Sequence, residues 1–229
     1  MLRTIISLLF IAGLAGLLAG CGGGGFAQRN ASFSYARNEG ILSYGGRGQA
    51  RRYTKKGARQ LRSARLSDRA PRGSYGKAPK NAFKGRDYSH THLNPRTALK
   101  LINSYRISKG LQPLKLNGRL SEAAREHSRD LARHDRISHY GSDGSDPLLR
   151  VQRTGYPVHL AAENVGTGQA SLAEVFKGWQ KSPGHNENLL LKGAKEMGIA
   201  LVVDPGTEYK TFWTLVLGSK RKTAYSSSR

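Results

Sequence analysis

The stretch Met197-Gly198-Ile199-Ala200-Leu201-Val202-Val203 decides the fold class of this chain of 229 residues. It is a continuous run of small and branched apolar residues, and a second run extends from Lys210 to Leu217. The sequence Asp204-Pro205-Gly206-Thr207 lies between them. Two apolar runs joined by a Pro-Gly turn are typical of a hairpin of central, buried strands. With Glu163 to Thr167 as a third strand, the sequence predicts a small antiparallel sheet.

Amphipathic helices are expected to cover this sheet. Asn94 is a suitable N-cap, Pro95 follows it at the first helical position, and apolar residues then recur at three- and four-residue steps as far as Gly110. Each such helix has one apolar face, which must pack against another element. Further helices are expected over residues 118–134, 148–154 and 171–179, with a short helical turn after residue 184. The predicted fold is a three-layer α/β/α sandwich.

Three short polar segments interrupt this apolar pattern and contain His139, Glu163 and His185. An acid between two histidines, each histidine in a Gly-rich turn, is typical of a small polar cleft whose walls are loops on a rigid scaffold. Asn164 is expected to hold one of these loops. His127 lies on the apolar stripe of the second helix, where a hydrogen-bonded core histidine is expected rather than a ligand.

The cleft residues leave three interpretations open. Two imidazoles and one carboxylate are enough for a zinc site with an open position, which would make His139, Glu163 and His185 the centre of a metal-dependent hydrolase. Alternatively, the cleft binds a peptide, lipid or cell-wall fragment without catalysis, and Glu163 fixes the imidazoles by hydrogen bonds. In the third interpretation the polar network only holds three loops together. The sequence contains no nucleophile elbow and no zinc helix motif.

The N-terminus carries an export signal. Arg3 is followed by the apolar run from Ile5 to Leu18, the pattern of a secretory signal peptide. The end of this segment, Leu18-Ala19-Gly20-Cys21, resembles a bacterial lipoprotein box, in which the cysteine is lipidated; the alternative is an ordinary signal peptide cut near Gly20. Cys21 is the only cysteine, so no disulfide forms within the chain. We expect an exported monomer, lipid-anchored in the bacterial envelope, at the outer membrane or the cell surface.

A basic segment follows the anchor. Between Arg29 and Asp87 the chain has sixteen Lys or Arg and three acidic residues, a large part of its net charge of +23. Low hydrophobicity with high net charge predicts disorder. We expect this tether, residues 29–86, to contact anionic lipid or cell-wall polymer, or to act as a plain spacer. An exported chain does not meet chromosomal DNA, so no nucleic-acid partner is expected.

These features divide the chain into four parts. They are a signal peptide over residues 1–20, a lipidated cysteine and disordered basic linker over residues 21–90, a folded domain over residues 91–218, and a frayed basic tail over residues 219–229.

The predicted domain contains a series of short motifs. In chain order they are Leu111-Gln112-Pro113-Leu114, Ala123-Ala124 with His127-Ser128, Ser138-His139, Ala162-Glu163-Asn164, Trp179 and Ser182-Pro183-Gly184-His185. This series resembles the bacterial branch of the CAP superfamily, which includes the cysteine-rich secretory, antigen 5 and pathogenesis-related 1 proteins. The resemblance covers roughly Leu93 to Gly218. It implies an α/β/α sandwich of the SCP-like extracellular type, and a cleft lined by two His and two Glu that in some members holds a divalent metal.

The resemblance assigns three of the four cleft positions. His139 matches the first histidine, Glu163 the first glutamate and His185 the last histidine. The place of the second glutamate, beyond Trp179, is occupied by Gln180-Lys181-Ser182. An incomplete set implies no required cofactor and at most a weakly bound divalent metal such as Zn²⁺. Since most members have binding or signalling roles, we favour a binding module with a His/Glu cleft, and keep the metal-dependent hydrolase as the alternative.

Overall fold

The computed structural model describes residues 31–36, 42–44 and 73–221. The predictions for the signal peptide, for Cys21 and for most of the basic linker lie outside these residues. In the described part of the chain, no helix has the length and the apolar character needed to cross a membrane. The elements, in chain order, are β1 (Ala31–Ala36), β2 (Leu42–Tyr44), β3 (Tyr75–Lys77), α2 (Pro95–Ser108), β4 (Lys115–Leu116), α3 (Gly118–Arg133), β5 (Arg136–Ser138), α4 (Pro147–Arg153), β6 (Val158–Thr167), α5 (Leu172–Lys181), α6 (Pro183–Leu189), β7 (Glu196–Val203) and β8 (Thr211–Lys220).

The predicted hairpin is the centre of the sheet. β7 and β8 pair antiparallel, with Leu201 opposite Trp213. β6, which begins five residues before the predicted third strand, pairs antiparallel with the other side of β8. The full strand order is β2-β1-β6-β8-β7-β4, and the β4–β7 pair is parallel. β3 and β5 form a separate two-stranded sheet.

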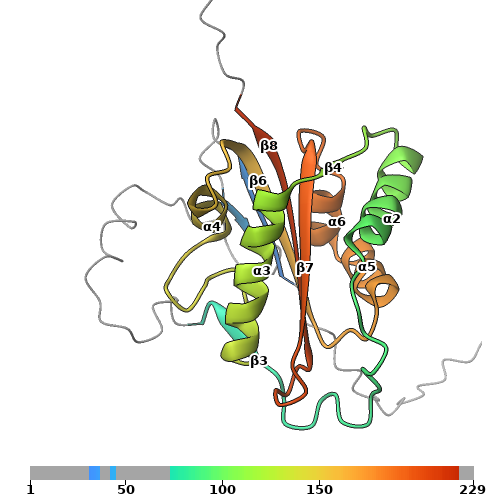
Figure 1. Ribbon diagram of the computed structural model, residues 1–229, viewed down its shortest axis with the longest axis vertical. Coiled ribbons are helices and arrows are strands. Elements are labelled where there is room, and N and C mark those ends of the chain that lie inside the picture. Colours follow the sequence, from blue (N-terminus) through green and yellow to red (C-terminus); the bar gives the residue numbers. More distant parts are fainter. Residues whose placement is uncertain (1–30, 37–41, 45–72, 222–229) are drawn as a thin grey trace, which may run out of the picture.

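Helices cover both faces of the sheet, which confirms the predicted α/β/α sandwich (Figure 1). α3 and α4 lie on one face, and α2, α5 and α6 lie on the other. The alternation of β8 explains this division, since successive side chains of a strand point to opposite faces. Val216 packs with Leu120 and Ala124 of α3, whereas Leu215 and its second neighbours pack among α2, α5 and α6.

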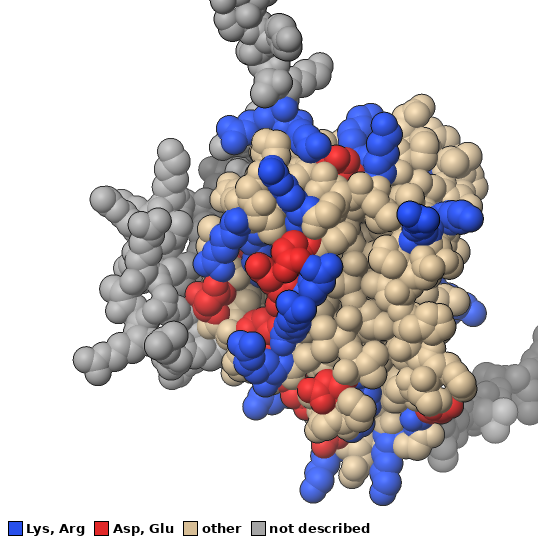
Figure 2. Space-filling model, in the orientation of Figure 1, with Lys and Arg blue, Asp and Glu red and all other residues tan. Residues whose placement is uncertain are grey.

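The helix ends follow from local sequence. The Asn94 side chain accepts hydrogen bonds from the backbone N–H groups of Arg96 and Thr97, and Pro95 takes the first helical position, as predicted. Ser171 caps α5 by accepting from the N–H of Glu174. α3 is strongly amphipathic, and Figure 2 shows acidic and basic side chains interspersed over its outer face. Its inner face lies directly on β7. The contact at Gly198 is so close that an added Cβ there would overlap the backbone of Leu120 and Ser121.

The folded part begins earlier than predicted. Sequence analysis placed residues 73–90 in the disordered linker, but in the structure β3 pairs with β5, and the segment after it packs on the domain. The Phe83 ring lies 5.9 Å from that of Tyr209, and Tyr88 donates a hydrogen bond to the carbonyl of Gly168. Arg86 pairs with Glu174 at 2.7 Å. Net charge wrongly indicated disorder for residues 73–90, because it contains no information on aromatic contacts or on partners that are distant in sequence.

The chain termini of the domain also differ from the prediction. β1 and β2 come from the segment predicted to be a disordered linker, and they extend the sheet beyond β6. At the other end, β8 continues through Lys220, so the first two residues of the predicted frayed tail belong to a strand. Residues 222–229 lie outside the described part.

Candidate functional site

β6 carries both Glu163 and Asn164, and its alternation sends their side chains to opposite faces of the sheet. Ala161, two residues before Glu163, packs in the core on the α3 side. Ala162, two residues before Asn164, packs in the core on the side of α2, α5 and α6. The predicted cleft residues therefore form two groups, one on each face, and Glu163 lies in β6, which includes the predicted third strand.

The first group is a buried network around Glu163. His139 Nδ1 lies 2.8 Å from Glu163 Oε1, and Arg150 Nη2 donates to Glu163 Oε2 at 2.8 Å. His127 Nε2 is 3.6 Å from Glu163 Oε1 and 2.8 Å from the carbonyl oxygen of Ser138. The side chains of Glu163 and of both histidines are at most 1% exposed. Both oxygens of the carboxylate are thus held by groups of the protein itself.

Charge in this network is balanced by Arg150. Burial raises the pKa of Glu163, but the charges of Arg150 and His127 and the hydrogen bond with His139 outweigh it, and the pKa falls to about 2. Burial lowers the pKa of His127 to about 4, with a further decrease from Arg150 and an opposing effect of Glu163. At neutral pH the network therefore contains a carboxylate, a guanidinium and a neutral His127 imidazole.

Sequence analysis missed Arg150. This residue lies on α4, where its guanidinium also donates to the carbonyl oxygens of Ser145 (2.8 Å) and His139 (3.0 Å). A guanidinium has five donors and stays charged when buried, so it can hold several acceptors in a fixed arrangement. The available signal was a single cation inside the apolar stretch Leu148 to Val151. His127 is buried and hydrogen-bonded, as predicted for a core histidine, but it also lies against Glu163.

The second group ties α6 to β6. Asn164 Nδ2 donates to the backbone carbonyl of His185 at 3.0 Å, and Asn188 Nδ2 donates to Asn164 Oδ1 at 2.9 Å. Asn188 also reaches the backbone carbonyl of Glu163 at 3.1 Å. His185 itself is fully buried in the first turn of α6. Asn164, which was expected to hold a loop, thus holds the first turn of α6, which carries His185.

The predicted metal ligands do not fit a divalent cation in this arrangement. A ligating carboxylate needs an oxygen directed at the ion, whereas both Glu163 oxygens are engaged, one of them by Arg150 at 2.8 Å. The guanidinium also places a positive charge where a cation would bind. Among the residues that the structure describes, no three His, Cys, Asp or Glu side chains are arranged to hold a metal ion. The geometry therefore does not support His139, Glu163 and His185 as a ligand set.

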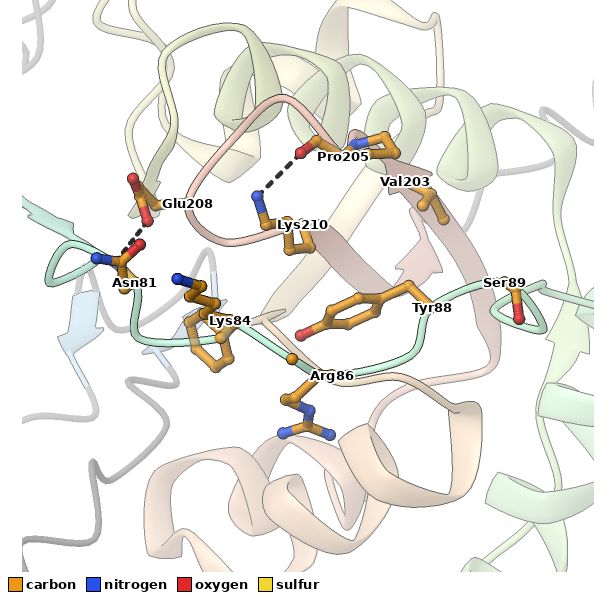
Figure 3. Close-up of a pocket in the computed structure, with 11 residues that line it drawn as sticks. Asn81, Lys84, Arg86, Tyr88, Ser89, Val203, Pro205, Glu208 and Lys210 are labelled. Atoms are coloured by element: carbon orange, nitrogen blue, oxygen red, sulfur yellow. Dashed lines mark hydrogen bonds between the residues drawn. The ribbon is translucent and has the colours of Figure 1, made fainter.

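Two surface hollows lie away from these residues. The first, about 540 Å³, lies between residues 81–89 and the β7–β8 turn (Figure 3). The Tyr88 ring lies across it, while Arg86 points away toward α5 and Lys210 donates to the carbonyl of Pro205. The second, about 870 Å³, lies at the opposite end of β8. Its basic lining residues are Lys115, His159, Lys195, Lys220 and Arg221, with Glu196 as the acid. Neither hollow is lined by a predicted site residue.

The sequence of the domain matches a known protein family. The model of the cysteine-rich secretory protein family (CAP) matches residues 99–217. The uncharacterized protein YkwD of Bacillus subtilis (strain 168) is 29% identical over 119 residues, which cover 52% of this chain and 44% of YkwD. This chain therefore spans less than half the length of that relative.

Solved structures that share the fold include the following two. An outer surface protein from Borrelia burgdorferi has a TM-score of 0.51 and 21% identity, covering 55% of this chain and 92% of that one. An extracellular protein containing a SCP domain from Bacillus anthracis has a TM-score of 0.50 and 24% identity, covering 63% of this chain and 45% of that one. At these identities the likeness is one of fold.

Proposed function

This chain belongs to the cysteine-rich secretory protein (CAP) family, since the family model matches residues 99–217. We propose that it is an exported CAP/SCP-like domain that binds a ligand of the cell envelope without catalysis. The ligand class is a peptide, a lipid or a cell-wall fragment. The binding site is built on the part of β6 that carries Glu163 and Asn164, and His139 and the His185 segment help to hold this part of the strand in place. A divalent metal is not required.

The proposal rests on the burial of the Glu163 carboxylate and on its contacts with His139 and Arg150. A general base, a nucleophile or a metal ligand needs a carboxylate oxygen within reach of the substrate or ion. Here His139 and Arg150 occupy both oxygens, and the carboxylate is buried. The same contacts suit a scaffold, because they fix the position of β6 between two helical layers. The alternative, a metal-dependent hydrolase using His139, Glu163 and His185, requires Arg150 to leave the carboxylate.

Two features support an envelope location and an anionic partner. Lipidation of Cys21 would hold the chain on a membrane, and the basic tether over residues 29–86 would add attraction to anionic lipid or cell-wall polymer. The domain contributes a second basic surface, the hollow at the end of β8 with Lys115, Lys195 and Arg221 among its lining residues. Together these segments favour a polyanionic surface near the anchor.

Binding to envelope material tests the proposal. The full chain, with Cys21→Ser so that no acyl chain contributes, is sedimented with peptidoglycan sacculi and, separately, with anionic phosphatidylglycerol vesicles. We expect saturable binding to one of them, reduced at least tenfold by His185→Ala. Tether-driven binding should weaken between low and high salt, since exposed charges are screened. Binding to neither material would contradict the proposal, as would release of soluble fragments that Glu163→Gln abolishes.

Titration with zinc addresses the alternative directly. Calorimetry of the same chain with Zn²⁺ should show affinity weaker than micromolar, because Arg150 blocks Glu163. Sub-micromolar affinity that His185→Ala removes would restore the hydrolase interpretation.

A further inference from the structure

The two polar groups of the site meet only around the outer edge of β6. Glu163 faces α3 and α4, with His139 and Arg150 as its partners, whereas Asn164 faces α6 and holds the His185 segment. The sheet itself separates these groups, and β8 closes the inner side of β6. A further strand can therefore pair with β6 only along the side of β6 that faces away from β8.

This side of β6 lacks the usual protection of an edge strand. Exposed edges present unpaired N–H and C=O groups, and proteins guard them with lysine, proline, bulges or short strands. The residues from Leu160 to Thr167 include no Lys, Arg or Pro. The one charged side chain among them, Glu163, is buried and paired. Such an edge is a template for pairing with an extended chain.

A segment of the same chain occupies this edge in the structure. β1 pairs antiparallel with β6 from Ala31 opposite Val165 to Ala36 opposite Leu160, so that Phe33 lies opposite Glu163. β1 pairs in turn with β2, a strand of three residues that ends the sheet. The segment reads Ala-Ser-Phe-Ser-Tyr-Ala, in which serine alternates with aromatic residues, a period-two pattern typical of strands.

We propose that the outer edge of β6, from Leu160 to Val165, is a docking site for one extended polypeptide strand, and that residues 31–36 are its resident occupant. This inference deepens the proposed function, on which it rests, by naming the ligand class as an extended peptide held through its main chain. Strand addition of this kind obtains affinity from backbone hydrogen bonds. A competing peptide gains access when residues 31–36 leave the edge, so the N-terminal segment controls access to the site.

Hydrogen exchange on the full chain tests the resident strand. Proline has no N–H and is found only in edge strands or at bulges, so Ser34→Pro disrupts β1, a strand with a partner on each side. The matched control, Ser34→Thr, keeps the donor. We expect the amides of residues 160–165 that face β1 to lose protection at least tenfold in Ser34→Pro, while the amides of β6 that face β8, and those of β7 and β8, stay unchanged. Fast exchange of the β1-facing amides in the unmodified chain would refute the resident strand.

Peptide binding tests the docking site. A fluorescein-labelled peptide of residues 30–37 should bind the Ser34→Pro chain at least tenfold more tightly than the unmodified chain or Ser34→Thr. If Ser34→Pro perturbs the core, which buried Trp179 and Trp213 would report by fluorescence, a chain lacking residues 31–44 replaces it. An exposed edge that does not bind the peptide would overturn the docking site. Since sacculus and vesicle binding are measured separately, this result and a failure of the proposed function are distinguishable.

Discussion

Replacement of Arg150 by methionine should destabilise the domain more than any change on its surface. The guanidinium donates to Glu163 Oε2 and to the carbonyl oxygens of His139 and Ser145, all at 2.8–3.0 Å. Methionine has a similar volume and removes all three donors. Its main effect is to leave the buried Glu163 carboxylate without its positive partner, because His127 is neutral at pH 7.

The magnitude follows from the burial of the pair. Removal of one partner of a buried ion pair costs about 3–5 kcal/mol, because the remaining charge is uncompensated. A domain of this size has a free energy of unfolding of about 5–15 kcal/mol, so Arg150→Met should lose a large part of it. Arg150→Met with Glu163→Gln should be more stable than Arg150→Met alone, although it carries two changes, since a neutral amide needs no counter-charge.

Urea unfolding followed by the fluorescence of Trp179 and Trp213 measures these differences, since both indoles are fully buried. The control is Arg153→Met on the same helix, where a half-exposed pair with Asp143 contributes at most about 1 kcal/mol. The deficit of Arg150→Met should shrink as the pH falls below 4.5, because the unmodified chain then loses the stabilisation that comes from the lowered pKa of Glu163. A loss below about 1 kcal/mol for Arg150→Met, or no recovery in the double variant, would refute the reasoning.

Three further outcomes are expected. The urea midpoint of the unmodified chain should fall as the pH decreases from 6.5 toward 4. The pKa of His127 is lowered to about 4 in the folded protein, so over this pH range the unfolded state binds more protons than the folded state. His127→Gln should therefore flatten this part of the profile. Below pH 4.5 the midpoint should fall again, because the pKa of Glu163 is lowered to about 2. Gly198→Ala should abolish soluble folded protein, since the new methyl group overlaps the α3 backbone, while Gly118→Ala, with open space around it, should melt normally. Cys21→Ser should move the protein from the membrane fraction to the soluble fraction of cells fractionated at high salt, where the attraction of the basic tether to the envelope is screened.

Much of the fold was predictable because local signals and tertiary packing agree. The Asn94-Pro95 start of α2 and the Ser171 cap of α5 are satisfied by atoms within three residues, so they are visible in the sequence. The apolar runs of β7 and β8 are continuous because helices cover both faces of the sheet. Such elements need no knowledge of distant partners.

The parts that sequence analysis missed depend on distant partners. Arg86 and Glu174, or Arg150 and Glu163, are separated by more than ten residues, and nothing in their local sequence specifies the pairing. Composition described residues 73–90 by net charge alone, although Phe83 packs against Tyr209. His139 lies next to Glu163 and the His185 segment lies next to Asn164, but the distribution of these residues over two faces follows from the register of β6, which a motif does not reveal.

That distribution gives the adjacent pair Glu163 and Asn164 a joint role. Because they are consecutive on one strand, Glu163 ties β6 to α4 through Arg150, while Asn164 ties the same strand to α6. A displacement of β6 at this point would disturb both helical layers, so the position of its edge is strongly fixed before any ligand arrives. A preformed edge of this kind loses little conformational freedom when an extended chain pairs with it, which is the condition under which main-chain hydrogen bonds yield net affinity. Under the proposed function, the buried network serves binding by keeping β6 in place, and its own side chains do not need to touch the ligand.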